Sequence, residues 1–104
     1  MRTNHIIIDY AAAIDRRDWE ALADCFTADA VIRFPDGLTL DADAYVDHLQ
    51  SLHGSREFTV LDIVSEGERA ALQATISTEA ATRYFAGFFT IADGLISRLD
   101  EVLA

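Results

Sequence analysis

The stretch YAAAIDRRDWEALADCFTADAVIRFPDG, Tyr10 to Gly37, contains the change of pattern that decides the fold. Apolar residues recur at helical spacing from about residue 4 to 16, and again over about 19–26 after a break of charged residues. A β-branched, apolar run then follows from Val31 to Phe34, and Pro35, the one proline of the chain, ends it. The stretch therefore predicts two helices followed directly by a strand and a turn.

The remainder of the chain favours one more helix and then mostly strands. A short strand over 38–40 precedes a third helix over about 43–53, which Gly54 ends. Alternating segments rich in β-branched and aromatic residues follow, and they predict strands over 57–65, 69–80, 84–91 and 95–103. Helices followed by a meander of antiparallel strands indicate an α+β fold in one domain, residues 1–104, and argue against repeated βαβ units.

Composition excludes several classes of partner. The chain has 104 residues and a formal net charge of −10, and its eight basic residues are all arginine. Nucleic acids and anionic membranes require a cationic surface, so neither is expected as a partner. The single cysteine, Cys25, excludes an internal disulfide and fits a reducing compartment. Without a signal-peptide pattern or a membrane-spanning run, the expected location is the cytoplasm.

Two segments together suggest a family. Tyr10 to Gly37, which includes Thr27-Ala28-Asp29-Ala30, resembles the opening of nuclear transport factor 2-like proteins, in particular SnoaL-like polyketide cyclases and ketosteroid isomerases. The closing FFTIADGLISRLDEVLA, Phe88 to Ala104, is similar to the final hairpin of that superfamily. The resemblance implies a cone-shaped, curved antiparallel sheet wrapped around the N-terminal helices, with an apolar pocket. It also implies a homodimer formed through the outer sheet face, and no cofactor.

The isomerase site is incomplete in this sequence. The resemblance implies a hydrogen-bond-donating tyrosine on the first helix, which is Tyr10 here. It places the catalytic base immediately before the proline, where this chain has Phe34, and a second donor near Gly87. A phenyl ring cannot accept a proton, and glycine has no side chain to donate one. Ketosteroid isomerase chemistry is therefore not expected.

The last strand offers another acid–base candidate. SnoaL-like cyclases carry an acid on this strand, often with a histidine on the strand before it, which this chain lacks. Strict alternation places Leu99, Glu101 and Leu103 on one face, and Ile96, Arg98, Asp100 and Val102 on the other. A carboxyl group between leucines in an apolar pocket would have its charged form disfavoured, as a general base requires. Alternatively the strand frays and Glu101 is solvated, or a one-residue slip turns Asp100 inward.

Aromatic and apolar residues are candidates for the pocket lining. They come from both helical and strand segments, and Gly87 between two aromatics leaves space for a ligand or relieves crowding at a bend. The same residues also serve as core in the alternative interpretation. No metal site is expected, because the histidines are not spaced as ligands. The candidate substrate-binding residues are Trp19, Phe34, His48, Phe85, Gly87, Phe89 and Leu99.

Three hypotheses of function remain. The first is an enzyme for proton transfer or cyclisation of a small apolar carbonyl compound, with Glu101 or Asp100 as acid–base and Tyr10 as donor. The second is a non-catalytic module that binds a small ligand or dimerises, without ketosteroid isomerase activity. The third is a protein-interaction adaptor, as in the transport members of the superfamily. An ionisable group with a perturbed pKa inside the pocket would favour the enzyme.

Overall fold

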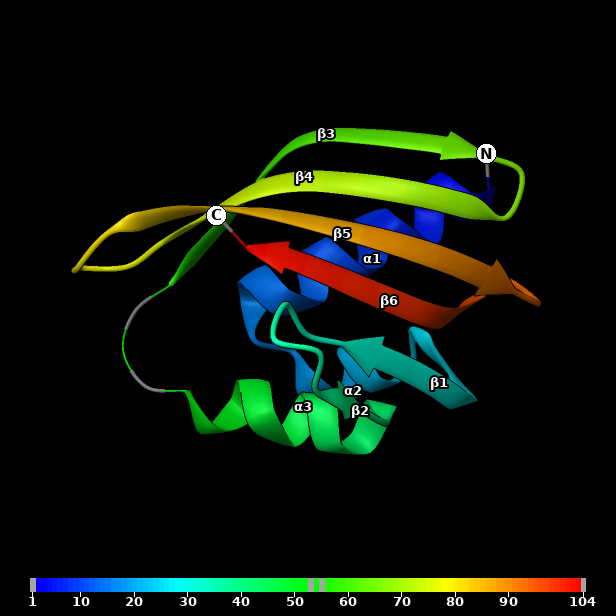
Figure 1. Ribbon diagram of the computed structural model, residues 1–104, viewed down its shortest axis with the longest axis horizontal. Coiled ribbons are helices and arrows are strands. Elements are labelled where there is room, and N and C mark those ends of the chain that lie inside the picture. The colour runs from blue at the N-terminus through cyan, green and yellow to red at the C-terminus, as the bar shows by residue number, and fades with distance from the viewer. Residues whose placement is uncertain (1, 53, 55, 104) are drawn as a thin grey trace.

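The computed structural model describes residues 2–52, 54 and 56–103, and it has the predicted order of elements (Figure 1). Two helices come first, a pair of antiparallel strands separates them from a third helix, and four long strands complete the chain. This arrangement confirms the α+β prediction. The elements are α1 (Arg2–Arg16), α2 (Trp19–Ala23), β1 (Phe26–Arg33), β2 (Thr39–Leu40), α3 (Ala42–Ser51), β3 (Glu57–Glu66), β4 (Arg69–Ser77), β5 (Thr82–Ala92) and β6 (Leu95–Leu103).

The six strands form one curved sheet in the order β2-β1-β6-β5-β4-β3. Neighbouring strands are antiparallel except β1 and β6, which run parallel and join the first part of the chain to its last strand. Strands β2 and β3 are edges, so the sheet wraps without closing. Helix α1 lies across its concave side against β3 and β4, and α3 packs beside β1 (Figure 1). None of the helices in the described residues has the length and hydrophobicity needed to cross a membrane.

The predicted end of the second helix and the predicted start of the first strand are both wrong. The second helix, expected over 19–26, ends at Ala23, and β1 begins at Phe26 instead of Val31. Asp18 caps α2 well, but this helix buries only Leu22, so little packing favours its extension. The following residues pair irregularly with β6 instead, and this tertiary pairing overrides the local helical pattern. Helix α3 ends at Ser51, whereas its predicted last residue, 53, lies outside the described residues.

Helix α1 ends in a left-handed residue that is not glycine. The Asp18 N–H donates to the Ala13 carbonyl at 2.9 Å and the Arg17 N–H to the Ile14 carbonyl at 3.1 Å, which is the Schellman pattern. The residue at the turn is Arg17, with φ of 58°. Because glycine adopts this conformation without steric cost, an arginine here is a local compromise.

A bulge in β6 changes the faces on which its residues lie. Ile96 pairs with Ile91 and Arg98 with Thr90, so Ser97 is an extra residue on its strand. The Ser97 hydroxyl donates to the Thr90 carbonyl at 3.1 Å. Ile96 and Leu99 are consequently both fully buried. The prediction that Ile96 shares the outer face with Arg98 is therefore wrong, because strict alternation does not hold across a bulge.

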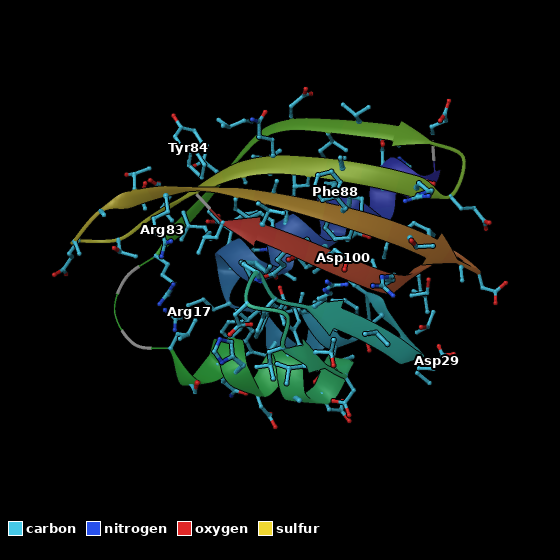
Figure 2. All side chains as sticks on the ribbon, in the orientation of Figure 1. Arg17, Asp29, Arg83, Tyr84, Phe88 and Asp100 are labelled. Carbon is cyan, nitrogen blue, oxygen red and sulfur yellow. The ribbon has the colours of Figure 1, made fainter. Side chains whose placement is uncertain are left out.

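The outer face of the sheet carries Asp100 of β6 and exposed aromatic residues of β5 (Figure 2). Val102 on β6 and both Tyr84 and Phe88 on β5 are about half exposed or more. On the inner face Phe85 and Phe89 flank Gly87, as expected. A Cβ at Gly87 would approach Phe89 Cε1 to 3.0 Å, so neighbouring side chains already occupy that space.

The face assignment of β6 can be tested with a matched pair of substitutions. Leu99→Ala should lower the free energy of unfolding by about 2–5 kcal/mol, because it empties a fully buried site. Val102→Ala, three residues later and half exposed, should lower it by only about 0.5 kcal/mol. Urea denaturation of both variants measures the difference, and equal losses would contradict the register described above.

Candidate functional site

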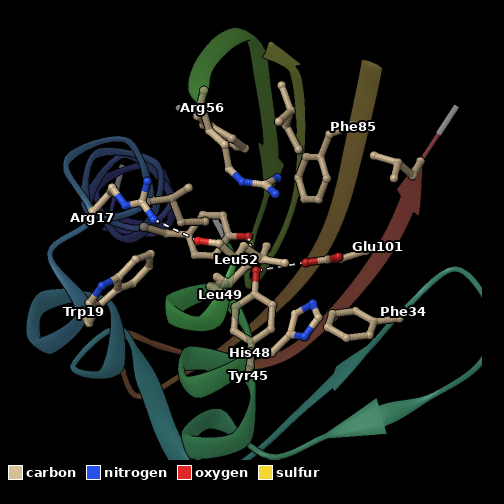
Figure 3. A pocket seen from close by; sticks show the side chains of 15 residues that line it. Arg17, Trp19, Phe34, Tyr45, His48, Leu49, Leu52, Arg56, Phe85 and Glu101 are labelled. Carbon is tan, nitrogen blue, oxygen red and sulfur yellow. Dashed lines mark hydrogen bonds between the residues drawn. The ribbon is translucent and has the colours of Figure 1, made fainter. Parts of the chain in front are cut away.

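A cavity of about 180 Å³ opens between the helices and the concave side of the sheet (Figure 3). Helices α1 and α2 contribute Tyr10 and Trp19 to its wall, and α3 contributes Tyr45 and His48. The end of β1 and strands β3 to β6 complete the lining. Most lining side chains are aliphatic or aromatic, so the few polar groups stand in apolar surroundings.

Three polar side chains form a hydrogen-bonded chain in this wall. The hydroxyl groups of Tyr10 and Tyr45 lie 2.8 Å apart, and the Tyr45 hydroxyl donates to Glu101 Oε2 at 2.9 Å. Both tyrosines are essentially fully buried. A buried hydroxyl group without a partner is costly, so each tyrosine stabilises the burial of the other. These two hydrogen bonds also connect α1, α3 and β6 with one another.

The two tyrosines remain protonated across the physiological range. Burial is the main cause that raises the pKa of each phenol well above its ordinary value, and the nearby Glu101 raises it further. When Glu101 is ionised it can only accept, so Tyr45 donates to it and Tyr10 donates to Tyr45. The hydroxyl hydrogen of Tyr10 is then bonded to Tyr45, so Tyr10 affects a molecule in the cavity only through the Tyr45 hydroxyl group.

Glu101 is a carboxyl group of the cavity whose pKa lies near neutrality. Burial between apolar neighbours raises the pKa of its carboxyl group to about 7, although the hydrogen bond from Tyr45 opposes the shift. Near pH 7 both protonation states are therefore populated, which is the condition for a group that takes up and returns a proton. The carboxyl group lines the cavity directly.

Six of the predicted site residues come together around this cavity. Tyr10 and Glu101 belong to the hydrogen-bonded chain, and Trp19, Phe34, His48 and Phe85 line the wall. The Phe34 ring lies 6.0 Å from the ring of Tyr45 and 5.3 Å from that of His48, between centroids. Phe34 thus forms an apolar wall at the place where the family resemblance implied a base.

The other predicted site residues do not reach the cavity. Gly87, Phe89 and Leu99 are buried but do not line it, and the ring of Phe89 packs edge-on against that of Tyr10 at 5.1 Å between centroids. Asp100 lies on the outer face, since the register keeps Glu101 inward.

Asp100 has a partner of its own on that outer face. Its carboxylate accepts two hydrogen bonds from Arg98, at 2.9 and 3.3 Å, which lower its pKa. Of the two carboxyl groups proposed from sequence, only Glu101 is thus available to a molecule in the cavity.

Sequence reasoning missed three polar residues of the lining: Arg17, Tyr45 and Arg56. Tyr45 lies on the apolar face of the helix that the sequence predicts over about 43–53, and this pattern predicts burial of the ring without a function for the hydroxyl group. A tyrosine on a buried helix face requires a hydrogen-bond partner, and Tyr10 presents the same requirement, so the two could have been paired. The position of Arg56 depends on how the chain enters β3, which no local pattern indicates.

Metal ligation and thiol chemistry find little support in the described part of the chain. No cluster of metal-ligating side chains occurs there. Burial raises the pKa of the Cys25 thiol to about 11, helped by Asp9 and Asp24 nearby, which leaves it protonated and unreactive. The Glu101 carboxyl group, with its pKa near neutrality, is therefore the candidate for acid–base chemistry in this site.

Glu101 should impose a pH dependence on stability. Its pKa is about 7 when folded and 4.5 in an ordinary environment, so the folded state holds the proton more tightly. The resulting stabilisation is complete below about pH 4.5, is lost as pH rises to about 7, and amounts to at most about 3 kcal/mol. Relative to Glu101→Gln, the wild type should lose stability across this range in urea denaturation. Asp100→Asn should parallel the wild type, and identical profiles for all three proteins would contradict the assignment.

Known proteins share both the sequence profile and the fold of this chain. The profile of the SnoaL-like domain matches residues 7–99. A candidate ketosteroid isomerase from Kribbella flavida superimposes with a TM-score of 0.94 at 21% identity, over 99% of this chain and 78% of that one. A candidate polyketide cyclase from Sinorhizobium meliloti gives 0.83 at 25% identity, over 94% of each chain.

A third neighbour has a different assigned chemistry. An LEH-like epoxide hydrolase from M. tuberculosis gives a TM-score of 0.83 at 14% identity, over 99% of this chain and 83% of that one. No curated protein matches the sequence. The profile match over most of the chain, together with the shared fold, places this protein in the SnoaL-like domain family.

Proposed function

We propose that this protein catalyses proton transfer at a carbon next to the carbonyl group of a small apolar compound, with Glu101 as the acid–base group. The observation that carries the proposal is the Glu101 carboxyl group, held by Tyr45 at 2.9 Å in an apolar cavity, with a pKa of about 7. Cyclisation is the same chemistry when the resulting enolate attacks a second carbonyl group of the same molecule.

The hydrogen-bonded chain suggests how the proton is handled. In the ionised state Glu101 accepts from Tyr45 through one oxygen and presents the other to a substrate. After it takes a proton from carbon, the carboxyl group is neutral and no longer needs the Tyr45 hydrogen. The Tyr45 hydroxyl can then reorient toward the enolate oxygen, while Tyr10 continues to donate to it. Tyr10 is in this mechanism a positioning residue.

Two structural neighbours support chemistry of this class, because one is assigned as a ketosteroid isomerase and another as a polyketide cyclase. The proposal differs from the isomerase arrangement in its base. Phe34 occupies the position before Pro35, so the proton acceptor comes from the last strand. A substrate would lie between Phe34 and Phe85, with its reacting carbon directed to Glu101.

Adjacent carboxyl groups on opposite faces of β6 allow a matched test. Exchange of the α-hydrogens of 2-indanone and cyclohexanone in D2O, followed by NMR, should be accelerated by the wild type, and its rate should increase with pH around 7. Glu101→Gln should reduce the acceleration by about 10²- to 10⁴-fold. Asp100→Asn, on the outer face, should retain it. Loss of activity in Asp100→Asn alone, or full activity in Glu101→Gln, would contradict the proposal.

A non-catalytic binding module is the second candidate. It is favoured by the predominantly apolar lining and by Phe34 at the position of the missing base. In that case small apolar ligands bind, Glu101→Gln binds them equally well, and no carbonyl compound exchanges its hydrogens faster than in buffer.

We further propose that two copies associate through the outer face of the sheet. Val64, Tyr84, Phe88 and Val102 leave 49% to 63% of their surface exposed there. An apolar area of this kind on a sheet face commonly marks an interface.

Phe88→Glu should convert a dimer to a monomer in size-exclusion chromatography with light scattering. Leu38→Glu, at an equally exposed turn residue away from the sheet face, should leave the dimer intact, and a monomeric wild type would overturn the proposal.

A further inference from the structure

Two arginines line the same cavity as the glutamate. Arg17 projects from the end of α1, and Arg56 projects from the residue before β3. In Figure 3 the Arg17 guanidinium group lies across the cavity from Glu101, and that of Arg56 extends over the cavity toward Phe85. The chain has only eight basic residues and a net charge of −10, so two arginines in one small cavity are a marked local concentration.

Arg17 is held in place by contacts with the end of α3. Its Nη2 donates to the Leu52 carbonyl at 3.1 Å, and its Nη1 donates to the Gly54 carbonyl at 3.2 Å. Its guanidinium carbon lies 5.9 Å from the centre of the Trp19 ring. These two bonds use only part of a guanidinium group, which has five N–H donors. Arg17 has a left-handed backbone conformation, which usually favours glycine, and it places a cation beside the cavity at this position.

Arg56 is less restrained. Within the described residues it makes neither an ion pair nor a side-chain hydrogen bond that meets ordinary distance criteria. Eighteen acidic residues are present in the chain, yet among the described residues that line the cavity only Glu101 carries a carboxyl group, and it is bonded to Tyr45. Within the described residues neither Arg17 nor Arg56 forms an ion pair, so no direct partner there neutralises the positive charge that they bring to the cavity.

We infer that the ligand of this cavity carries a carboxylate, which Arg17 and Arg56 hold, on an apolar frame of about one ring. The planar donor fork of arginine matches the two oxygens of a carboxylate, and the aromatic walls match a ring. An apolar cavity of roughly 150 Å³ accommodates benzene, so about 180 Å³ suits one substituted ring. This inference rests on the proposed small-molecule site and specifies its substrate class.

The arginines and the glutamate then have separate roles. The carboxylate is anchored at the arginines, and the ring lies against Phe85 and Phe34. The carbon that Glu101 reaches is therefore in a different part of the molecule from the anchoring group. A substrate with both groups, a keto acid on a small ring, fits this division.

Trp19 provides a direct measurement of binding, because it is the only tryptophan and lines the cavity. Its fluorescence is titrated with phenylacetate and with phenylacetamide, which has the same shape and no charge, and with benzoate and benzamide as a second pair. For the wild type each acid should bind on the order of tenfold to a hundredfold more tightly than its amide. Arg56→Gln should reduce this preference by about tenfold or more.

Arg69→Gln is the matched control for charge. Arg69 is an exposed arginine on β4, seven residues from Ile76 of the cavity wall, or roughly 23 Å along the strand. This variant should keep the full preference for the acids, and Arg56→Lys should keep only part of it. An unchanged preference in Arg56→Gln would overturn the inference, and so would an equal loss in Arg69→Gln.

The outcome is separable from that of the proposed catalysis. Equal binding of acid and amide by the wild type would overturn the inference and leave a cavity that binds small molecules. A preference for acids that persists in Glu101→Gln, in a protein that exchanges no carbonyl hydrogens, would support the inference while the catalytic proposal fails. Absence of binding by all four probes would overturn the inference.

Discussion

The extra residue in β6 is the constraint on which both the core and the cavity depend. A strand alternates its side chains strictly, so a single inserted residue exchanges the two faces for everything that follows. With Ser97 as that residue, Ile96 and Leu99 both enter the core, and Glu101 follows them on the concave side. Without the bulge, burying Ile96 would turn Asp100 toward the cavity and Glu101 toward the outer face. The inward position of Glu101 is thus set at Ser97, four residues before it.

The cavity wall is held together by polar groups as much as by apolar packing. Tyr10, Tyr45 and Glu101 come from three different elements, and each of their hydrogen bonds satisfies a group that would be costly to bury alone. Arg17 fixes the far end of α3 to the end of α1 in a similar way. Helix α3 is therefore held by hydrogen bonds near both ends, at Tyr45 and at Leu52, on either side of the residues that it contributes to the cavity. Such preorganisation lowers the entropy lost on binding.

The sequence predicted the elements whose patterns are local and long. The last strand was placed at its observed bounds, Leu95–Leu103, because an Asp-Gly turn and continuous alternation define it. The start of β1 was missed, because Phe26 is paired with Ile96 of β6, seventy residues later, and no local pattern indicates this pairing. The inward face of Glu101 was expected from alternation with the leucines around it, and this holds because the bulge lies before these residues.

The parts of the site that sequence did not predict are those that depend on two distant segments. Tyr45 and Arg56 were not identified, since their roles exist only once α3 and β3 are packed against the rest. Phe89 and Leu99 were predicted to line the cavity, whereas both are buried away from it, Phe89 against the ring of Tyr10. Apolar patterns indicate that a residue is buried, but they do not distinguish the wall of a cavity from the layer beneath it.

The place of β6 in the sheet also bears on the order in which the molecule can form. Strand β6 follows the other five strands along the chain, yet it lies in the interior of the sheet, between β1 and β5. Until it arrives, β1 and β2 have no partner in the rest of the sheet, and the helices cover an incomplete surface. Contacts this distant in sequence slow folding, because the chain must close a long loop before they stabilise anything. A nascent chain that stops before residue 95 lacks β6, the strand that joins β1 and β2 to the rest of the sheet. We expect such a chain to be unfolded and sensitive to proteases until β6 has been synthesised.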